Sequence, residues 1–116
     1  MIKIARGFNP MTDRYAFDFD RCTAAKGWAQ LDTRQDASYY GTWANPELRQ
    51  IINYCEGDIT TTTMDTDEEF VAEIRKWADW VNEHDWGPAQ IDPGFPERPL
   101  FARFVELGLG DLCGIA

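Results

Sequence analysis

The sequence of 116 residues contains a single histidine, His84, and three cysteines, Cys22, Cys55 and Cys113. No two cysteines form a C-x-x-C pair for zinc binding or redox chemistry, and the odd number leaves at least one thiol unpaired. No serine or cysteine nucleophile can be matched with a histidine base at a recognisable spacing, and neither a Walker loop nor a G-x-G-x-x-G motif is present. These absences predict a protein that is not an enzyme, uses no cofactor and keeps reduced thiols.

Basic side chains are also scarce, because 11 Lys and Arg residues stand against 20 Asp and Glu residues, for a formal net charge of −9. Phosphate binding requires a cationic surface that releases counterions, so direct binding of nucleic acid is excluded as the main activity. No window approaches the roughly 18 apolar residues of a membrane span, and the N-terminus has no apolar run of signal-peptide length. We therefore expect a cytoplasmic protein that does not contact a membrane.

The first half of the chain has the composition of strands. No repeat or linker divides the sequence, so we expect one domain over residues 1–116. Alternating aromatic residues predict strands at 14–20, 27–33 and 38–43. Residues 46–56 fit either a helix that begins after Asn45 and Pro46 or a strand, and the turn signal Glu56-Gly57-Asp58 favours a hairpin of 48–56 with 58–64.

The second half has the period of helices. Thr66-Asp67-Glu68-Glu69 is a capping box, and one apolar stripe follows it, which predicts a helix over about 66–85. A shorter helix is predicted from Pro99 to about Leu107, closed by Gly108. The expected inward residues of the two helices are Phe70, Ile74, Trp77 and Val81 in the first and Leu100, Phe101, Phe104 and Val105 in the second.

Together these elements predict an α+β fold. We expect an antiparallel sheet of four to five strands with the main helix packed on one face and the short C-terminal helix following it. The stripe of the main helix is expected to pack against the face of the sheet that carries the aromatic rings.

Acidic side chains are concentrated in the predicted main helix. Residues 65–85 contain eight acids against Arg75 and Lys76, and the apolar stripe directs most of these acids to solvent. Such a ridge would repel nucleic acid and attract a basic protein groove, although an acidic surface can also serve only solubility. Trp80 lies at the shoulder of the stripe and fits either a wide core or an interface anchor. The predicted partner-binding residues are Asp67, Glu68, Glu69, Glu73, Asp79, Trp80 and Glu83.

Two other kinds of site are compatible with the sequence. Carboxylates at Asp18, Asp20, Glu56 and Asp58 could form an oxygen-rich site for a divalent metal in a small enzyme or a ligand-binding domain, although alternation along a strand also explains the first pair. Aromatic rings at Trp28, Tyr39, Tyr40 and Trp43 could stack on bases or sugars, but core packing explains them equally well.

Three stretches of the chain, residues 6–15, 37–46 and 54–58, resemble small proteins of phages, plasmids and other mobile elements. That group includes acidic inhibitors of bacterial defence, among them anti-CRISPR proteins and DNA mimics. The resemblance implies a non-catalytic binder that inhibits a basic host protein by occupying its nucleic-acid-binding surface. It carries over no functional residue. Separately, we expect the chain to be a monomer or a homodimer.

Overall fold

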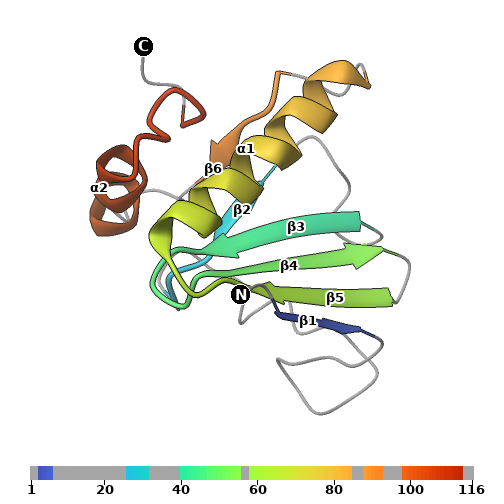
Figure 1. Ribbon diagram of the computed structural model, residues 1–116. Helices are drawn as coiled ribbons and strands as arrows, with labels where there is room; N and C mark the ends of the chain where they lie inside the picture. The colour runs from blue at the N-terminus through green and yellow to red at the C-terminus, as the bar shows by residue number, and fades with distance from the viewer. Residues whose placement is uncertain are drawn as a thin grey trace.

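The computed structural model describes residues 3–6, 26–31, 40–55, 58–84, 88–92 and 98–113. Within these residues the chain forms one antiparallel sheet and two helices, which confirms the α+β prediction (Figure 1). The helices are α1 (Asp67–Glu83) and α2 (Arg98–Glu106). The strands are β1 (Lys3–Arg6), β2 (Ala29–Leu31), β3 (Tyr40–Asn45), β4 (Gln50–Cys55), β5 (Asp58–Thr63) and the two-residue β6 (Ile91–Asp92).

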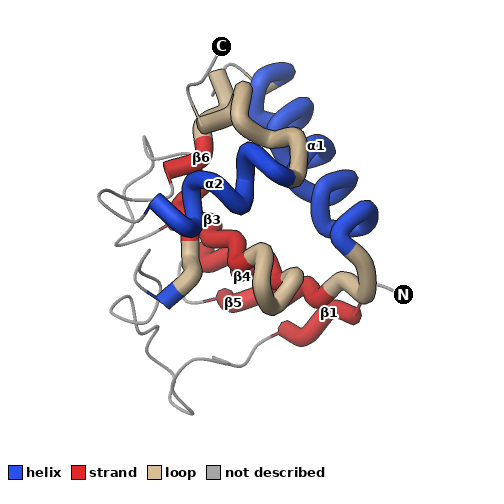
Figure 2. The backbone as a smooth tube through the Cα atoms, turned by 90° about the vertical axis from the view of Figure 1, so that its left-hand side faces the viewer, coloured by secondary structure: helices blue, strands red, loops and turns tan. Residues whose placement is uncertain are grey.

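The sheet has the order β1-β5-β4-β3-β2-β6, and every neighbouring pair is antiparallel. Strands β2 to β5 therefore form a meander, and the first and last strands close its two edges. Both helices lie on the same side of the sheet, and β1 and β5 lie farthest from α1 (Figures 1 and 2). The predicted strand at 14–20 lies outside the described residues, and β1 was not predicted as a separate strand.

The hydrogen bonds of Asn45 explain why residues 46–55, within the segment for which the sequence allowed a helix or a strand, form a turn and a strand. The side-chain Oδ1 of Asn45 accepts hydrogen bonds from the amides of Glu47 at 3.0 Å and Leu48 at 3.1 Å. Asn45 thus caps a turn over residues 46–49 in place of a helix, and the chain returns as β4. The hairpin of β4 with β5 is confirmed, with Cys55 paired to Asp58 at its tip.

The main core lies between the helices and the sheet. Phe70, Ile74, Ala78 and Val81 of α1 are buried, and Trp77 packs against them from a half-buried position. Each large side chain buried in this way stabilises the fold by roughly 1.5–3 kcal/mol. The facing strands contribute small and aliphatic side chains, namely Ala29, Leu31 and Ala44.

Trp28, just before β2, and Trp43 of β3 lie on the opposite face, so the prediction that α1 packs against these rings was wrong. Trp28 is 5% exposed and Trp43 is 4% exposed, and they form a second cluster with Ile52 and Ile59. Trp43 lies close over Gly41, where an added Cβ would come within 2.2 Å of the indole. Since strand side chains alternate between faces, the alanines next to the tryptophans point toward α1 and leave room for the helix.

Helix α2 ends in a glycine motif that the sequence predicted. The amide of Gly108, at φ 80°, donates to the carbonyl of Val105, and the amide of Leu109 donates to that of Phe104, each at 2.9 Å. These two bonds form a Schellman motif, and buried Leu109 completes it. Val105 itself is 44% exposed, so its predicted inward orientation was wrong, because Leu100 and Phe104 provide the buried side of the helix.

Candidate protein-binding surface

The outer side of α1 forms an exposed stripe. Its members recur at three- and four-residue intervals, as expected for one side of a helix. The stripe consists of Glu68, Ala72, Lys76, Asp79, Trp80 and Glu83. Four of the seven predicted partner-binding residues therefore lie in the exposed stripe, and the other three, Asp67, Glu69 and Glu73, are half-buried at its sides.

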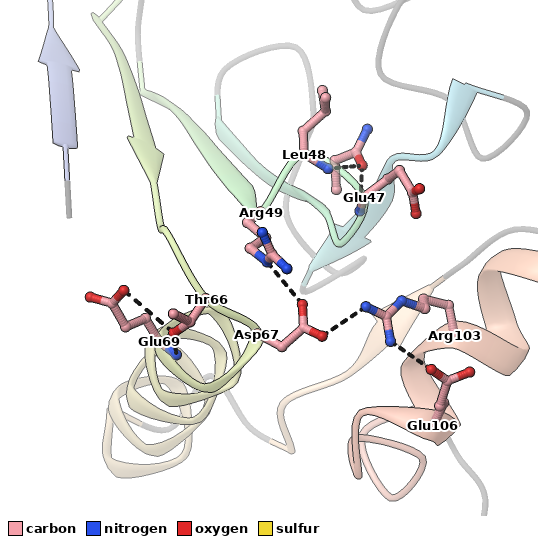
Figure 3. A network of polar contacts seen from close by, with 9 residues as sticks. Glu47, Leu48, Arg49, Thr66, Asp67, Glu69, Arg103 and Glu106 are labelled. Atoms are coloured by element: carbon pink, nitrogen blue, oxygen red, sulfur yellow. Dashed lines mark hydrogen bonds and ion pairs between the residues drawn. The ribbon is translucent and has the colours of Figure 1, made fainter. Parts of the chain in front are cut away.

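Two of the three acids in the first turn of α1, Asp67 and Glu69, make contacts within the molecule (Figure 3). Thr66 is the N-cap, and its Oγ1 accepts a hydrogen bond from the Glu69 amide at 3.1 Å. The same hydroxyl donates to Glu69 Oε1 at 3.4 Å, so the Glu69 carboxylate reaches back to the N-cap residue as predicted. The contacts of Glu69 with Thr66 therefore stabilise the start of the helix.

Asp67 joins three separate parts of the chain. Its Oδ1 accepts a hydrogen bond from Arg49 Nε at 2.9 Å, and its Oδ2 accepts one from Arg103 at 3.0 Å (Figure 3). Arg49 is the last residue of the β3–β4 turn, and Arg103 belongs to α2, where it also bonds Glu106. The two arginines hold the pKa of Asp67 below its ordinary value of 3.8. Asp67, which was predicted as a partner-binding acid of the ridge, is thus paired within the molecule, because two arginines distant in sequence converge on it.

Arg75 ties the middle of α1 to the segment after α2. Its guanidinium donates to both carboxylate oxygens of Asp111, at 2.8 and 2.9 Å, and to the carbonyl of Gly108 at 2.8 Å. The paired arginine lowers the pKa of Asp111. Of the two basic residues of α1, Arg75 thus contacts this segment, whereas Lys76 is exposed within the stripe.

Near its C-terminus α1 presents an aromatic pair to solvent. Trp80 is 47% exposed, and its ring stacks on the His84 imidazole with centroids 4.3 Å apart and planes 22° apart. His84 is the C-cap, and its Nδ1 lies 2.8 Å from the Trp80 carbonyl oxygen. The structure therefore places Trp80 outside the core, and His84 holds its ring in one orientation.

Asp79 and Glu83 flank this pair. Both are exposed, and their four-residue spacing places them next to each other on the helix. We use the term Trp80 patch for Asp79, Trp80, Glu83 and His84. The sequence singled out three of these four residues, but it gave His84 no role at this surface. The i, i+4 spacing from Trp80 was the signal that could have indicated it.

The residues predicted for an aromatic stacking platform and for a metal site are either buried or have side chains that the structure does not describe. Burial of Trp28 and Trp43 rules them out as an open stacking platform, and the side chains of Tyr39 and Tyr40 are not described. Asp18, Asp20 and Glu56 lie outside the described residues, and Asp58 is described only as part of β5. In the part of the chain that the structure describes, no group of three or more His, Cys, Asp or Glu side chains is placed to hold a metal ion.

Cys113 is a half-buried free thiol beside the main core. Burial, assisted by the charges of Asp111 and Asp92, raises its pKa to about 11. The thiolate is the reactive form of cysteine, so this environment suits packing rather than nucleophilic chemistry.

Comparisons with known proteins add nothing to these observations. No protein-family model matches the chain, and the searches of curated proteins and of solved structures gave no match. Among the described helices, none is long and apolar enough to cross a membrane.

Proposed function

We propose that the chain is a non-catalytic binding protein that competes with nucleic acid for a basic surface of another protein. The observation that carries this proposal is the exposed stripe of α1, where three acids and a tryptophan face solvent on a rigid helix. Its concrete form is an inhibitor of a bacterial defence protein encoded by a mobile element, as the resemblance of residues 6–15, 37–46 and 54–58 implies.

Charge and rigidity support the proposal in different ways. A net charge of −9 accelerates encounter with a cationic surface over distances of about one Debye length, roughly 8–10 Å at physiological salt. Four buried side chains hold α1 on the sheet, and two arginine contacts tie it to α2 and the segment that follows. A surface that is already ordered loses less entropy on binding.

The test has two stages. First, the tagged full chain is used to capture proteins from bacterial lysate at low and at high salt, and a labelled oligonucleotide is then added to the captured protein. We expect capture at low salt, loss of capture at high salt, and oligonucleotide binding that the chain displaces. Capture of a protein that binds the oligonucleotide and the chain at the same time would contradict competition.

The second stage compares two triple variants of equal charge. Reversal of Glu68, Asp79 and Glu83 to Lys removes the acids of the exposed stripe. Reversal of Glu47, Asp92 and Glu106 changes three exposed acids elsewhere; because Glu106 bonds Arg103, thermal unfolding must first verify that this control keeps its fold. We expect at least about a tenfold loss of affinity only in the first variant. Equal losses in both would show that net charge alone is responsible, and no loss in either would refute the proposed function.

A further inference from the structure

We propose that the Trp80 patch is an arginine-binding site, which receives one guanidinium of the partner between the indole of Trp80 and the carboxylates of Asp79 and Glu83. This inference rests on the proposed function and narrows it, because it assigns the specific contact to the C-terminal half of α1. The N-terminal half then contributes only long-range attraction.

The division between the two halves follows from the contacts of their acids. At the start of α1, Asp67 is already neutralised by Arg49 and Arg103, and Glu69 contacts Thr66. Asp79 and Glu83 are exposed on the same side of the helix as Trp80. Asp79 interacts electrostatically with Arg75, but the guanidinium of Arg75 donates its hydrogen bonds to Asp111. An incoming cation therefore meets two exposed carboxylates at the patch, whereas it would have to displace two arginines at Asp67.

The aromatic pair makes the patch selective for a planar cation. A guanidinium can lie flat on an indole and at the same time donate hydrogen bonds to carboxylates in its plane, whereas an ammonium is a strongly hydrated point charge. Stacking on His84 at 4.3 Å restricts the Trp80 ring before the partner arrives, so little side-chain entropy is lost on binding. Lys76, four residues before Trp80, is the basic member of the exposed stripe and limits how far an acidic site could extend toward the N-terminus.

The partner's chemistry follows from that of the patch. Surfaces that bind nucleic-acid phosphates are rich in arginine, because its fork of donors fits phosphate oxygens. A protein that covers such a surface meets arginines and must present carboxylates and flat apolar area to them. The Trp80 patch presents both within about one turn of helix.

The experiment measures the binding of hexa-arginine and hexa-lysine to the intact chain by calorimetry at low ionic strength. Both peptides are attracted by the net charge, so the ratio of their affinities is the informative quantity. We expect hexa-arginine to bind about fivefold more tightly, and the Trp80→Leu variant to lose this preference. Trp80→Phe keeps an aromatic ring and should retain part of the preference for hexa-arginine.

Two matched double variants test the carboxylates. Asp79→Asn with Glu83→Gln should weaken hexa-arginine binding about tenfold, whereas Glu68→Gln with Glu73→Gln should change it less than about twofold. Equal affinities of the two peptides for the wild-type chain, or an unchanged ratio in Trp80→Leu, would overturn the inference. Thermal unfolding of each variant verifies that these exposed substitutions leave the fold intact.

The two proposals can fail separately. If the Trp80 and Asp79/Glu83 variants still capture the partner at wild-type affinity but the triple Lys variant does not, the arginine site is refuted and the proposed function stands. If the triple Lys variant also captures the partner normally, the proposed function itself is refuted.

Discussion

In the first turn of α1, Asp67 accepts hydrogen bonds from two arginines and Glu69 contacts the N-cap, whereas in the last turns Asp79 and Glu83 are exposed beside a stacked tryptophan. The two ends of one helix thus carry acids of the same chemistry and use them differently. The first turn lies close to the β3–β4 turn and to α2, so the charge of Asp67 is neutralised within the molecule, whereas Glu68 is exposed (Figure 3). In the last turns Asp79 interacts electrostatically with Arg75, whose guanidinium bonds Asp111, and both Asp79 and Glu83 are exposed.

The largest expected effect separates buried from exposed aromatic rings on α1. Phe70 is fully buried, so Phe70→Ala should lower the free energy of unfolding by about 3–5 kcal/mol. Trp80→Ala, ten residues later, should lower it by less than about 1 kcal/mol because the ring is half exposed. Urea denaturation measures both. Similar losses in the two variants would mean that Trp80 belongs to the core and not to a binding surface.

The next effect concerns the start of the helix. Thr66→Ala removes the hydroxyl that accepts from the Glu69 amide, and it should lower the free energy of unfolding by about 1 kcal/mol. Thr66→Ser retains the hydroxyl and is the matched control. Binding of the hexa-arginine peptide should be unaffected by either change, provided that the fold is retained. Loss of peptide binding in Thr66→Ala alone would break the proposed separation between the two ends.

The dependence of stability on pH distinguishes the same two ends. The pKa of Asp67 lies below 3.8 in the folded state, so its contribution to stability is complete above that pH and is lost as the pH falls through the lowered pKa. Asp67→Asn should therefore have a lower thermal midpoint than the wild type at pH 7, and the difference should shrink below pH 3.8. Asp79→Asn is the control for the loss of one negative charge from the same helix. A constant difference for Asp67→Asn at all pH values would contradict the ion pairs.

The smallest effect tests the surroundings of the exposed ring by fluorescence quenching. Relative to free N-acetyltryptophanamide, caesium ions should quench Trp80 more strongly and iodide less strongly, because Asp79 and Glu83 attract cations and repel anions. In a Trp86→Phe background, Trp80→Phe should remove most of this difference between the two quenchers, since Trp28 and Trp43 are buried and Trp77 is half-buried. If the difference persists in Trp80→Phe, another tryptophan lies in the acidic surface.

Much of the fold could be predicted because its signals are local. The capping box at Thr66, the apolar stripe after it and Gly108 at the end of α2 each act within a few residues, and all three have the predicted roles. The turn capped by Asn45 was ambiguous for the same reason, because asparagine caps a helix and a tight turn with the same atom. Only the pairing of β4 with β3 and β5 decides between the two.

The candidate site was predicted in part. Trp80, Asp79 and Glu83 could be identified from helical spacing and charge, because exposure on a helix follows from the position of the apolar stripe. The pairing of Asp67 with two arginines could not be predicted, because Arg49 and Arg103 lie 18 and 36 residues away in the sequence. The face of the sheet covered by α1 was also missed, because alternation separates two faces without stating which one receives the helix.

The sequence alone determined the charge of this protein, the ends of its helices and the sides of α1 that are apolar and polar, since each depends on composition or on neighbours within one or two turns. Tertiary structure decided which acids are neutralised and which remain exposed, because the arginines that pair with Asp67 and Asp111 come from distant segments that only folding brings together. An acidic surface can be recognised from residue counts, but which of its carboxylates form ion pairs depends on where folding places the arginines.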